Sequence, residues 1–493
     1  MKKPRILFIT PLPPPVHGSA MVSQYIKDCK ELQEEFQCDF VNLSTSRNID
    51  EIGKKSLMKY IRFIGAYFIT FWKLLTHRYA LCYLAITCHG MGFLKDAPFV
   101  LLCKLFRRKI LIHQHNKGMS NCVDKQPYKW LLPLVYKNTK VILLSWYLYP
   151  DIEKVVKKEQ VVICPNGIPE LFDEEPHFER NNEVPHLLFL SNLIPSKGVY
   201  VLLDACKILK DKGYKFVCDF VGGESKEITK EIFEKAVEER GLNECAIYNG
   251  PKYGKEKELY FSKSNIMTHP TMNDAFPLVL LEAMQYKLPI ISTNIGGIAD
   301  IVEPMVNGLI TISGSPEELS NNIQKLLLDE NLRTLLGENG YKIFKKKYTK
   351  EQFEYGITNV LKNVIGGGVK FINYVGPKYG KKKNAYFEQT DIFVFPTYYE
   401  TFGLVNLEAM QYKLPIVTTD EGGIPDVVTD GENGFVCQRK DSISVANAIE
   451  NLFNDKNIRI QMGENGYKIF KEKFTLEQFC NNILSILKKQ IKH

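Results

Sequence analysis

Short apolar runs alternate with longer helical stretches along most of the chain. Near-continuous apolar strands separated by helices are typical of a parallel sheet that is covered by helices on both faces. The pattern therefore predicts an α/β fold built from doubly wound, Rossmann-like units. The runs that we interpret as strands include RILFIT (5–10), KILIHQ (109–114), VILLS (141–145), HLLFLS (186–191), KFVCDFVG (215–222), IMTHP (266–270), LPIIST (288–293) and GLITI (308–312).

Two breaks in this pattern divide the chain into domains. ICPNGIP (163–169) and the polar stretch that follows it to Pro185 predict a linker, and IGGG (365–368) marks a junction into the last part of the chain. We therefore expect one Rossmann-like domain over residues 1–170 and a second over 186–365. Two such domains facing each other place a ligand in the cleft between them, outside the carboxyl ends of the strands.

The last quarter of the chain repeats what precedes it. GPKYGK occurs at 250–255 and again at 376–381, and LEAMQYKLPI occurs at 281–290 and again at 407–416. Residues 368–493 are therefore a tandem repeat of residues 242–367. The repeat is too long for a solenoid unit, and we interpret 368–493 as a duplicated half-domain. In a sheet of order 3-2-1-4-5-6 it supplies runs for strands three to six and none for strands one and two; these runs lie at 371–375, 391–395, 415–419 and 434–437.

Composition excludes several classes of protein. A hydrophobic content of 45% with 24% charged residues is typical of a soluble globular enzyme. The net charge of +8 comes from scattered lysines rather than from a basic stripe, so we expect no nucleic-acid partner. The 12 cysteines are spread singly, which favours reduced thiols over disulfides or a zinc site. The chain begins directly with a strand, so no signal peptide and a cytoplasmic location are expected.

One segment, LMKYIRFIGAYFITFWKLL (57–75), has the character of a membrane-associated helix. Lys59, Arg62 and Lys73 interrupt it, and the uncharged part between them is too short to span a bilayer. Two interpretations stay open. It is either a helix packed into the core or a basic amphipathic helix on the inner face of a membrane.

The clearest chemistry lies in a word that occurs in both copies. TMNDAFPLVLLEAMQYKLP places Asp274 and Glu282 around a helix N-terminus, and TYYETFGLVNLEAMQYKLP does the same with Glu400 and Glu408. Backbone amides at such a terminus can hold phosphate oxygens while the acids accept sugar hydroxyls. Each acid could instead be a residue favoured by the helix dipole, but the repetition of the whole word favours a binding site.

Weaker signals point to the same kind of ligand. Gly18 follows a proline-rich loop at the start of a helix, and Lys197 stands where a strand leads into the next helix. Alone, Gly18 is better explained by an ordinary strand-to-helix turn, and Lys197 by a solvated charge. GGIAD (296–300) and GGIPD (422–426) add glycine pairs where the backbone must come close to another group.

Together, PPPVHG (13–18), HQHNKG (113–118), PNGI (165–168), SNLIPSKG (191–198) and the acid-x7-glutamate words resemble glycosyltransferase family 4, whose GT-B fold has two Rossmann-like domains facing across a cleft. The resemblance covers residues 5–361 and, through the repeat, the last third again. It implies a retaining transferase that moves a hexose or N-acetylhexosamine from a nucleotide-diphosphate sugar. It also implies no cofactor, no metal ion, and a polysaccharide or polyprenyl-diphosphate-linked acceptor.

The same resemblance assigns roles to residues. Lys197 would bind the donor diphosphate, Glu282 or Glu408 the ribose, and Asp274 or Glu400 the donor sugar. His115 would face the reacting centre from the first domain. The remaining donor-binding positions are Gly18, Phe276, Leu278, Gly296 and Gly297, with Phe402, Gly403, Gly422 and Gly423 in the second copy.

Two departures from the family pattern concern this site. Asn192 stands where many members have an arginine, so one phosphate partner is missing. Pro277 stands in the first copy where the second has Gly403, which makes the second copy closer to the usual word. Two rival functions stay open: a GT-B sugar-nucleotide epimerase, and an inactive or regulatory protein created by the duplication.

Sheet topology indicates which of the two copies we expect to form the active site. The strand at 391–396 has no neighbour on one side, a state that proteins normally avoid. It either packs elsewhere or competes with the first copy for the strand at 186–191. The first copy is synthesised earlier and lies closer to that strand, which favours it kinetically. We therefore expect Asp274 and Glu282 to form the working site.

Overall fold

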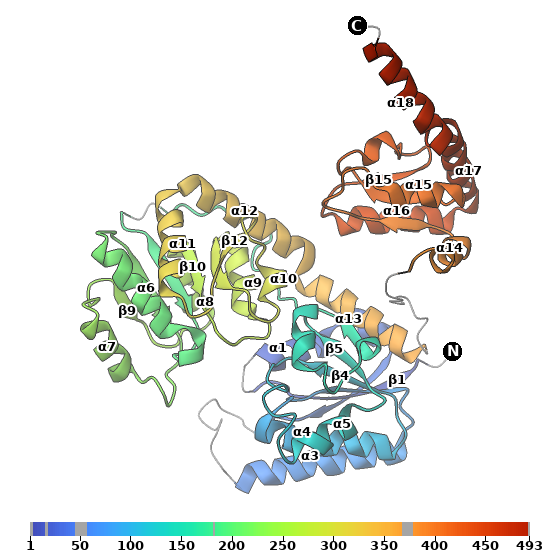
Figure 1. The fold of residues 1–493 in the computed structure, drawn as a ribbon. Helices are drawn as coiled ribbons and strands as arrows, with labels where there is room; N and C mark the ends of the chain where they lie inside the picture. The colour runs from blue at the N-terminus through green and yellow to red at the C-terminus, as the bar shows by residue number, and fades with distance from the viewer. Residues whose placement is uncertain (1–2, 15–17, 45–56, 181–182, 367–377, 492–493) are drawn as a thin grey trace. The chain divides into compact units, whose positions relative to one another are not determined.

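The computed structural model describes residues 3–491 except 15–17, 45–56, 181–182 and 367–377 (Figure 1). The chain forms two compact units, Met1–Val369 and Lys370–His493. We describe each unit by itself.

The first unit begins with a six-stranded parallel sheet of order β2-β1-β3-β4-β5-β6. Its central strands are buried along their whole length, which explains their near-continuous apolar sequences. The strands are β1 (Arg5–Thr10), β2 (Gln37–Asn42), β3 (Leu81–Ala85), β4 (Ile110–Gln114), β5 (Lys140–Leu143) and β6 (Val161–Ile163). The helices are α1 (Gly18–Asp28), α2 (Lys30–Glu35), α3 (Leu57–Thr76), α4 (Gly90–Leu105) and α5 (Tyr128–Tyr136).

A second parallel sheet in the same unit has the order β12-β11-β10-β7-β8-β9, which confirms the expected 3-2-1-4-5-6 arrangement. The direction of winding reverses between β7 and β10, the point where α/β proteins bind ligands. The strands are β7 (His186–Leu190), β8 (Val217–Val221), β9 (Ala246–Tyr248), β10 (Ile266–His269), β11 (Ile290–Thr293) and β12 (Gly308–Thr311). The helices are α6 (Val199–Asp211), α7 (Lys230–Glu239), α8 (Gly254–Lys263), α9 (Leu278–Gln285), α10 (Ile298–Ile301), α11 (Pro316–Leu328) and α12 (Glu330–Lys347).

Helix α13 (Lys350–Ile365) differs from the domain division drawn from the sequence. We expected it inside the second domain, but its apolar face is buried among side chains of the first sheet, including Ile6 and Phe8. The chain returns beside its own outward crossing: Lys350 N donates to Ile168 O at 2.8 Å, and Ile168 N donates to Tyr348 O at 3.0 Å. The first Rossmann-like domain is thus completed by a helix from the far end of the unit.

The second unit is a smaller α/β assembly with a three-stranded parallel sheet, β13-β14-β15. The run expected to form a strand at 371–375 lies outside the described residues. The strands are β13 (Phe393–Phe395), β14 (Ile416–Thr419) and β15 (Gly434–Cys437), and the helices are α14 (Lys381–Glu388), α15 (Leu404–Gln411), α16 (Ser442–Asn454), α17 (Lys456–Lys473) and α18 (Leu476–Ile491).

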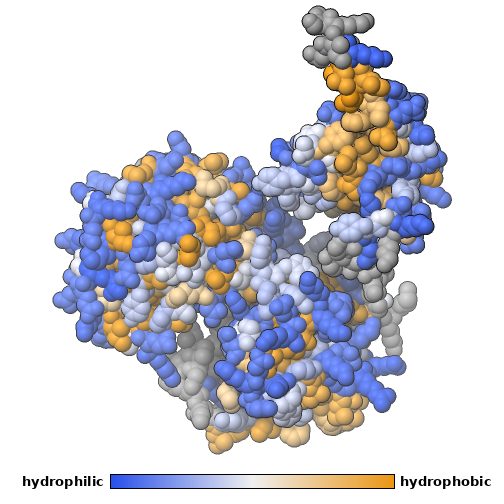
Figure 2. All heavy atoms as spheres, viewed as in Figure 1, coloured by the Kyte–Doolittle hydropathy of each residue, from blue (hydrophilic) through white to orange (hydrophobic). Residues whose placement is uncertain are grey.

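Helix α3 is the segment for which the sequence left two interpretations. It buries only Ala66, Thr70 and Leu74, so it is not a core helix. Aromatic contacts hold it against α4, with Phe63 and Tyr67 edge-on to Phe99. Its outer face is apolar and exposed, and Figure 2 shows hydrophobic residues gathered there, along the lower edge. Within the described part of the chain, no helix is long and apolar enough to span a bilayer.

Candidate active site

Two loops at the carboxyl ends of β7 and β10 build the site. After β7 the chain makes one 3-10 turn, η4 (Pro195–Lys197), and enters α6 through Gly198. Gly198 has a left-handed φ of 85°, and a Cβ there would lie 2.1 Å from the carbonyl oxygen of Pro270. Glycine is therefore required both by the backbone conformation and by the close approach of the second loop.

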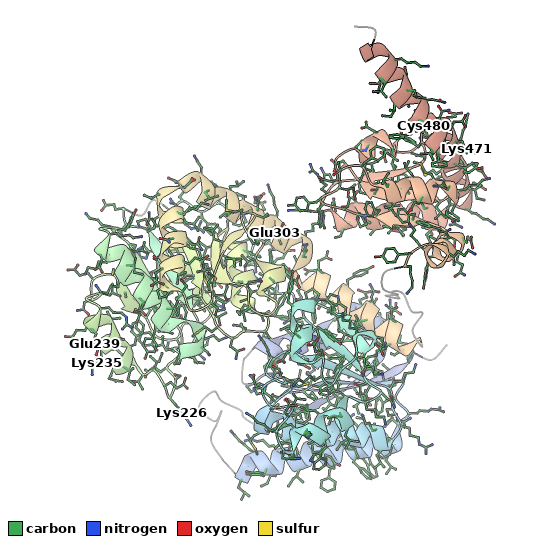
Figure 3. All side chains as sticks on the ribbon, viewed as in Figure 1. Lys226, Lys235, Glu239, Glu303, Lys471 and Cys480 are labelled. Atoms are coloured by element: carbon green, nitrogen blue, oxygen red, sulfur yellow. The ribbon has the colours of Figure 1, made fainter. Side chains whose placement is uncertain are left out.

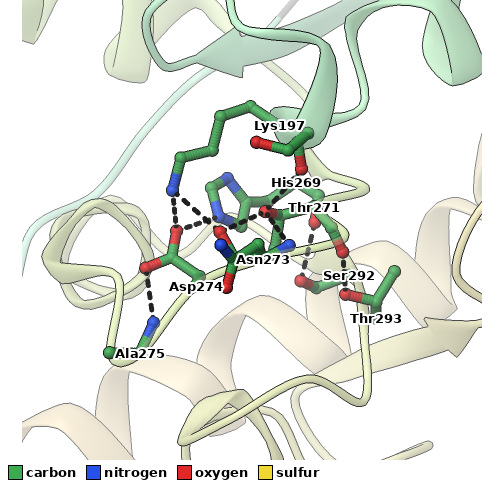
Figure 4. A network of polar contacts seen from close by, with 9 residues as sticks. Lys197, His269, Thr271, Asn273, Asp274, Ala275, Ser292 and Thr293 are labelled. Atoms are coloured by element: carbon green, nitrogen blue, oxygen red, sulfur yellow. Dashed lines mark hydrogen bonds and ion pairs between the residues drawn. The ribbon is translucent and has the colours of Figure 1, made fainter. Parts of the chain in front are cut away.

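Hydrogen bonds fix the second loop in place (Figure 4). Met272 N donates to Ser196 O at 2.8 Å, which ties the β10 loop to η4. Ser292 Oγ donates to His269 O at 2.8 Å, and Thr293 Oγ1 donates to Thr271 O at 2.6 Å, which tie it to β11. The loop that carries Asp274 is thus held from both neighbouring strands.

These loops bring together two residues predicted from separate motifs. Lys197 Nζ contacts Asp274 Oδ2 at 2.5 Å, and His269 Nε2 lies 3.3 Å from the same oxygen. Burial raises the pKa of Asp274, but the hydrogen bond from His269 and the charge of Lys197 outweigh it and lower the pKa to about 2. Asp274 is therefore a fixed anion beside a cation, at the start of the loop that leads into α9.

Glu282 lies in the second turn of α9 and has its own lysine partner. Lys257 Nζ donates to Glu282 Oε1 at 2.7 Å. Burial and the negative charge of Glu282 raise the pKa of Tyr25 on α1. Gly18, the first residue of α1, lies near α9, since a Cβ on it would be 3.6 Å from Leu278 Cδ1.

The glycine pair after β11 supports the acidic loop. Gly296 has a φ of 56°, and a Cβ on it would lie 2.4 Å from Asp274 O. Gly297 N donates to Ala275 O at 2.7 Å. Phe276 is 6% exposed and lies edge-on to Tyr348, so it packs the loop against the helix end. The structure thus gives Gly296, Gly297 and Phe276 a supporting place at the site, and their donor-binding role stays a prediction.

In the second copy, the segment that carries Glu400 and Glu408 has the same local structure as its counterpart in the first copy. Gly423 N donates to Thr401 O at 2.8 Å, and a Cβ on Gly422 would lie 2.0 Å from Glu400 O. Lys383 Nζ contacts Glu408 at 2.5 Å, as Lys257 contacts Glu282.

The acids at the start of the two words have different partners. Glu400 Oε1 accepts hydrogen bonds from Thr401 N at 2.9 Å and Phe402 N at 3.4 Å. Phe395 occupies the position of His269, and the repeated segment contains no equivalent of Lys197 because that residue precedes it. The second copy therefore carries the acids without the lysine and histidine that surround Asp274.

His115 comes directly after β4, at the carboxyl end of the first sheet. Its ring lies 4.0 Å, centroid to centroid, from that of His113. Burial and the charge of His115 lower the pKa of His113 well below its usual value. The structure thus places His115 at the edge where ligands bind to such sheets, and its role at the reacting centre stays a prediction.

Sequence reasoning missed His269 and Lys257. His269 is the last residue of β10, and the pairing of β10 with β7 brings it to Asp274 and Lys197. Asn192, which replaces a family arginine, accepts a hydrogen bond from Gly223 N at 3.0 Å and so supports a neighbouring loop. Among the described residues, no group of three or more His, Cys, Asp or Glu side chains could hold a metal ion.

Two Rossmann-like domains in one unit, with a lysine and acids at the switch point of the second, are the arrangement of the GT-B fold. The chain matches the family described as glycosyl transferases group 1 over residues 172–343 and 352–469, and it belongs to that family. The two matched segments include both acid-x7-glutamate words.

Individual relatives support this assignment. The chain is 31% identical over 222 residues to an uncharacterized glycosyltransferase of Methanocaldococcus jannaschii, which covers 45% of this chain and 58% of that protein. It is 34% identical over 108 residues to a capsular polysaccharide biosynthesis glycosyltransferase of Staphylococcus aureus, which covers 22% and 28%. The chain thus spans less than two thirds of the length of these relatives.

Solved structures show the same fold. Sucrose-phosphate synthase from Thermosynechococcus elongatus superposes with a TM-score of 0.59 at 17% identity, over 74% of this chain and 100% of that one. HepE from Anabaena in complex with UDP superposes with a TM-score of 0.54 at 16% identity, over 73% and 99%. About a quarter of this chain therefore lies outside each superposition.

Proposed function

We propose that the protein is a retaining, metal-independent hexosyltransferase of family 4 type that uses a nucleotide-diphosphate sugar. The observation that carries this proposal is the contact between Lys197 and Asp274 at the switch point, beside the N-terminus of α9. A cation and a helix N-terminus suit a diphosphate, and a fixed carboxylate suits sugar hydroxyls.

Each residue has a role in this scheme. Lys197 Nζ and the first amides of α9 neutralise the diphosphate as the bond between it and the anomeric carbon breaks. Asp274, ionised throughout the physiological range, accepts hydrogen bonds from the donor sugar. Glu282 accepts those of the ribose. The acceptor oxygen bonds to the same face of the anomeric carbon, and its proton leaves with the diphosphate.

The relatives suggest where to begin with substrates. HepE is described in complex with UDP-glucose, and the Staphylococcus aureus relative is named for capsular polysaccharide biosynthesis. We propose a UDP-hexose or UDP-N-acetylhexosamine donor, and a polysaccharide or polyprenyl-diphosphate-linked acceptor of capsule, O-antigen or exopolysaccharide assembly.

An acceptor of this kind suits a protein that works at the cytoplasmic surface of a membrane, and α3 offers the surface. Large apolar side chains recur along it at spacings of three and four residues, so they form one stripe. The stripe comprises Leu57 (77% exposed), Ile61 (53%), Ile64 (51%), Phe68 (65%), Trp72 (64%) and Leu75 (57%). A helix with one such face and flanking basic residues lies in the interface of a bilayer.

A donor screen tests the proposed function. Purified protein is incubated with each nucleotide sugar, with and without membrane lipid as the acceptor source, and release of the nucleotide diphosphate is measured. Release from one donor that rises with acceptor supports a transferase. Interconversion of the donor sugar without an acceptor would instead identify an epimerase. Absence of both reactions and of nucleotide binding would favour the inactive, regulatory alternative.

A further inference from the structure

Helix α18 carries a row of apolar side chains that the second unit leaves exposed. Phe479 is 62% exposed, Ile483 41%, Ile486 57% and Leu487 50%. Figure 2 shows this hydrophobic surface along the helix. A helix with one apolar face normally buries that face against another element. The sequence of α18 therefore predicts a packing partner for this face, and the second unit does not supply one.

The counterpart of this row in the first copy is fully packed. Phe479, Ile483, Ile486 and Leu487 repeat Phe353, Ile357, Val360 and Leu361 of α13. The four α13 residues are at most 8% exposed, and they lie in one cluster with side chains of the first sheet and of α1. Thr349 and Thr475 cap the two helices alike, each accepting a hydrogen bond at 3.3 Å from the third residue after it. The face of α18 therefore repeats the apolar positions with which α13 fills a groove on the first sheet.

A second surface of the appended half-domain, one edge of its sheet, also lacks a partner among the described residues of the second unit. In the first copy, β10 pairs with β7 through Ile266 and Leu187 and through Met267 and Leu188. In the described residues of the second unit, β13 pairs with β14 alone, so its other edge is unpaired. This is the edge that corresponds to the β7 side of β10.

We propose that residues 368–493 can replace residues 242–367 within the same chain, with β13 beside β7 and α18 in the groove of α13. The two copies are in one register, so the chain is continuous in either arrangement. In the observed form the second copy follows α13 in the chain. In the exchanged form residue 368 takes the place that residue 242 has in the observed form. Residues 242–367 are then an insertion at that one point of the domain, and such insertions are well tolerated.

Differences between the copies make the observed form the major one. Thr268 Oγ1 donates to Leu188 O at 3.0 Å, and its counterpart Val394 has no hydroxyl. Lys263 pairs with Asp219 at 2.8 Å, and its counterpart Gln389 is uncharged. In the groove of α13 the four apolar positions are kept, but buried Thr358 becomes Leu484, and Gly356, whose Cβ would lie 3.5 Å from Cys164 Sγ, becomes Asn482. The exchanged form is therefore a minor state that Glu400 and Glu408 would enter beside Lys197.

Substitutions in the full chain test this proposal. Ile357→Asp with Leu361→Asp disables α13, Ile483→Asp with Leu487→Asp disables α18, and a third protein carries all four changes. Thermal unfolding is followed by circular dichroism. We expect the α13 variant to keep a cooperative transition, the α18 variant to resemble wild type, and the protein with four changes to lose the transition of the first unit.

Cys480 on α18 gives a second readout (Figure 3). It is the one exposed cysteine among the 12 described, and its counterpart Glu354 has a side chain that is 18% exposed. Maleimide labelling of Cys480, followed by peptide mass, should be several-fold slower in the α13 variant than in wild type. The α18 variant is the control and should label at the wild-type rate.

Three results would overturn the proposal. The α13 variant could lose as much structure as the protein with four changes, or its Cys480 could label at the wild-type rate. The α13 variant could keep its thermal transition only at high protein concentration and elute as a dimer. That result would mean that α18 of a second molecule fills the groove. Leu361→Ala is a milder change in the same groove: it should lower Tm more when α18 is disabled, and an equal shift in both backgrounds also refutes exchange.

Discussion

Lys197 and Asp274 are 77 residues apart in the chain, and their side chains form an ion pair across two adjacent strand ends. The pair joins the two motifs that the sequence could interpret only separately. In the proposed scheme, this ion pair holds the lysine where the donor diphosphate binds.

Lys197→Ala should lower turnover strongly and leave the fold intact. Its charge acts on the departing diphosphate, and groups of this kind contribute about 3 kcal/mol, or ~100-fold in rate. Steady-state kinetics with the donor identified in the screen measure this. Lys207→Ala is the control, because Lys207 pairs with Asp211 on the surface of α6. A rate within twofold of wild type would remove Lys197 from the site.

Asp274 should make the stability of the first unit depend on pH in the acid range. Its folded pKa of about 2 lies below the value of about 3.9 in an unfolded chain, so its ionised form stabilises the fold. The contribution, about 2 kcal/mol, is complete above pH ~4 and is lost as pH falls towards 2. Urea unfolding of wild type and Asp274→Asn should therefore differ most at pH 6, differ by about half as much at pH 3, and converge only as the pH approaches about 2. A constant difference would contradict the assigned pKa.

Glu282→Ala and Glu408→Ala are a matched pair, since each removes the partner of one lysine, Lys257 or Lys383. We expect the first to be nearly inactive and the second nearly normal, because the first copy pairs with β7 and lies beside Lys197. Donor turnover measures both. The reverse outcome would show that the second copy holds the working site.

Gly198→Ala should destabilise the protein more than Gly213→Ala. Their φ values are 85° and 84°, so both substitutions carry the cost of a left-handed alanine, roughly 1–2 kcal/mol. At Gly213 nothing lies within 4 Å of the added Cβ, whereas at Gly198 the oxygen of Pro270 lies 2.1 Å from it. Urea midpoints compare the two. Equal losses would mean that the close approach of the loops contributes nothing.

The α3 stripe should bind anionic liposomes at low salt and release them at high salt. Phe68→Glu with Trp72→Glu should abolish flotation, and Lys59→Gln with Arg62→Gln should weaken it. Lys73 is left unchanged because it bonds to Asp39 at 3.2 Å. Leu259→Glu, at an exposed apolar position on α8, is the control. Absence of flotation by the wild type would refute the membrane assignment.

The sequence predicted the central strands better than the edges of the sheets. RILFIT and HLLFLS are buried apolar runs, and the structure has strands there. β2 and β6 were missed: they are edge strands with partly exposed residues, so they lack the continuous apolar run that marks a buried strand. The central strand β3 was missed too, although its sequence LCYLA is apolar throughout.

The site was predicted in its parts rather than as a whole. Acid-x7-glutamate and Lys197 could be recognised because each has a local spacing. His269 joins them only through the pairing of β10 with β7, which no local pattern encodes. The packing of α13 was unpredictable for a similar reason, since an amphipathic helix shows that one face is buried but not which domain buries it.

The crossing at Ile168 and Tyr348 has a mechanical consequence. The chain passes between the two Rossmann-like domains once in each direction, and hydrogen bonds join the two passages. Beyond Ile168 the linker adheres to the second domain, where Leu171 N donates to Gln285 Oε1 at 2.8 Å. A rotation of one domain against the other would pivot at this joint. Lys197 and Asp274 lie in the same domain, so the distance between them would stay fixed during this rotation. His115 lies in the other domain, so its distance from both residues would change with the angle between the domains.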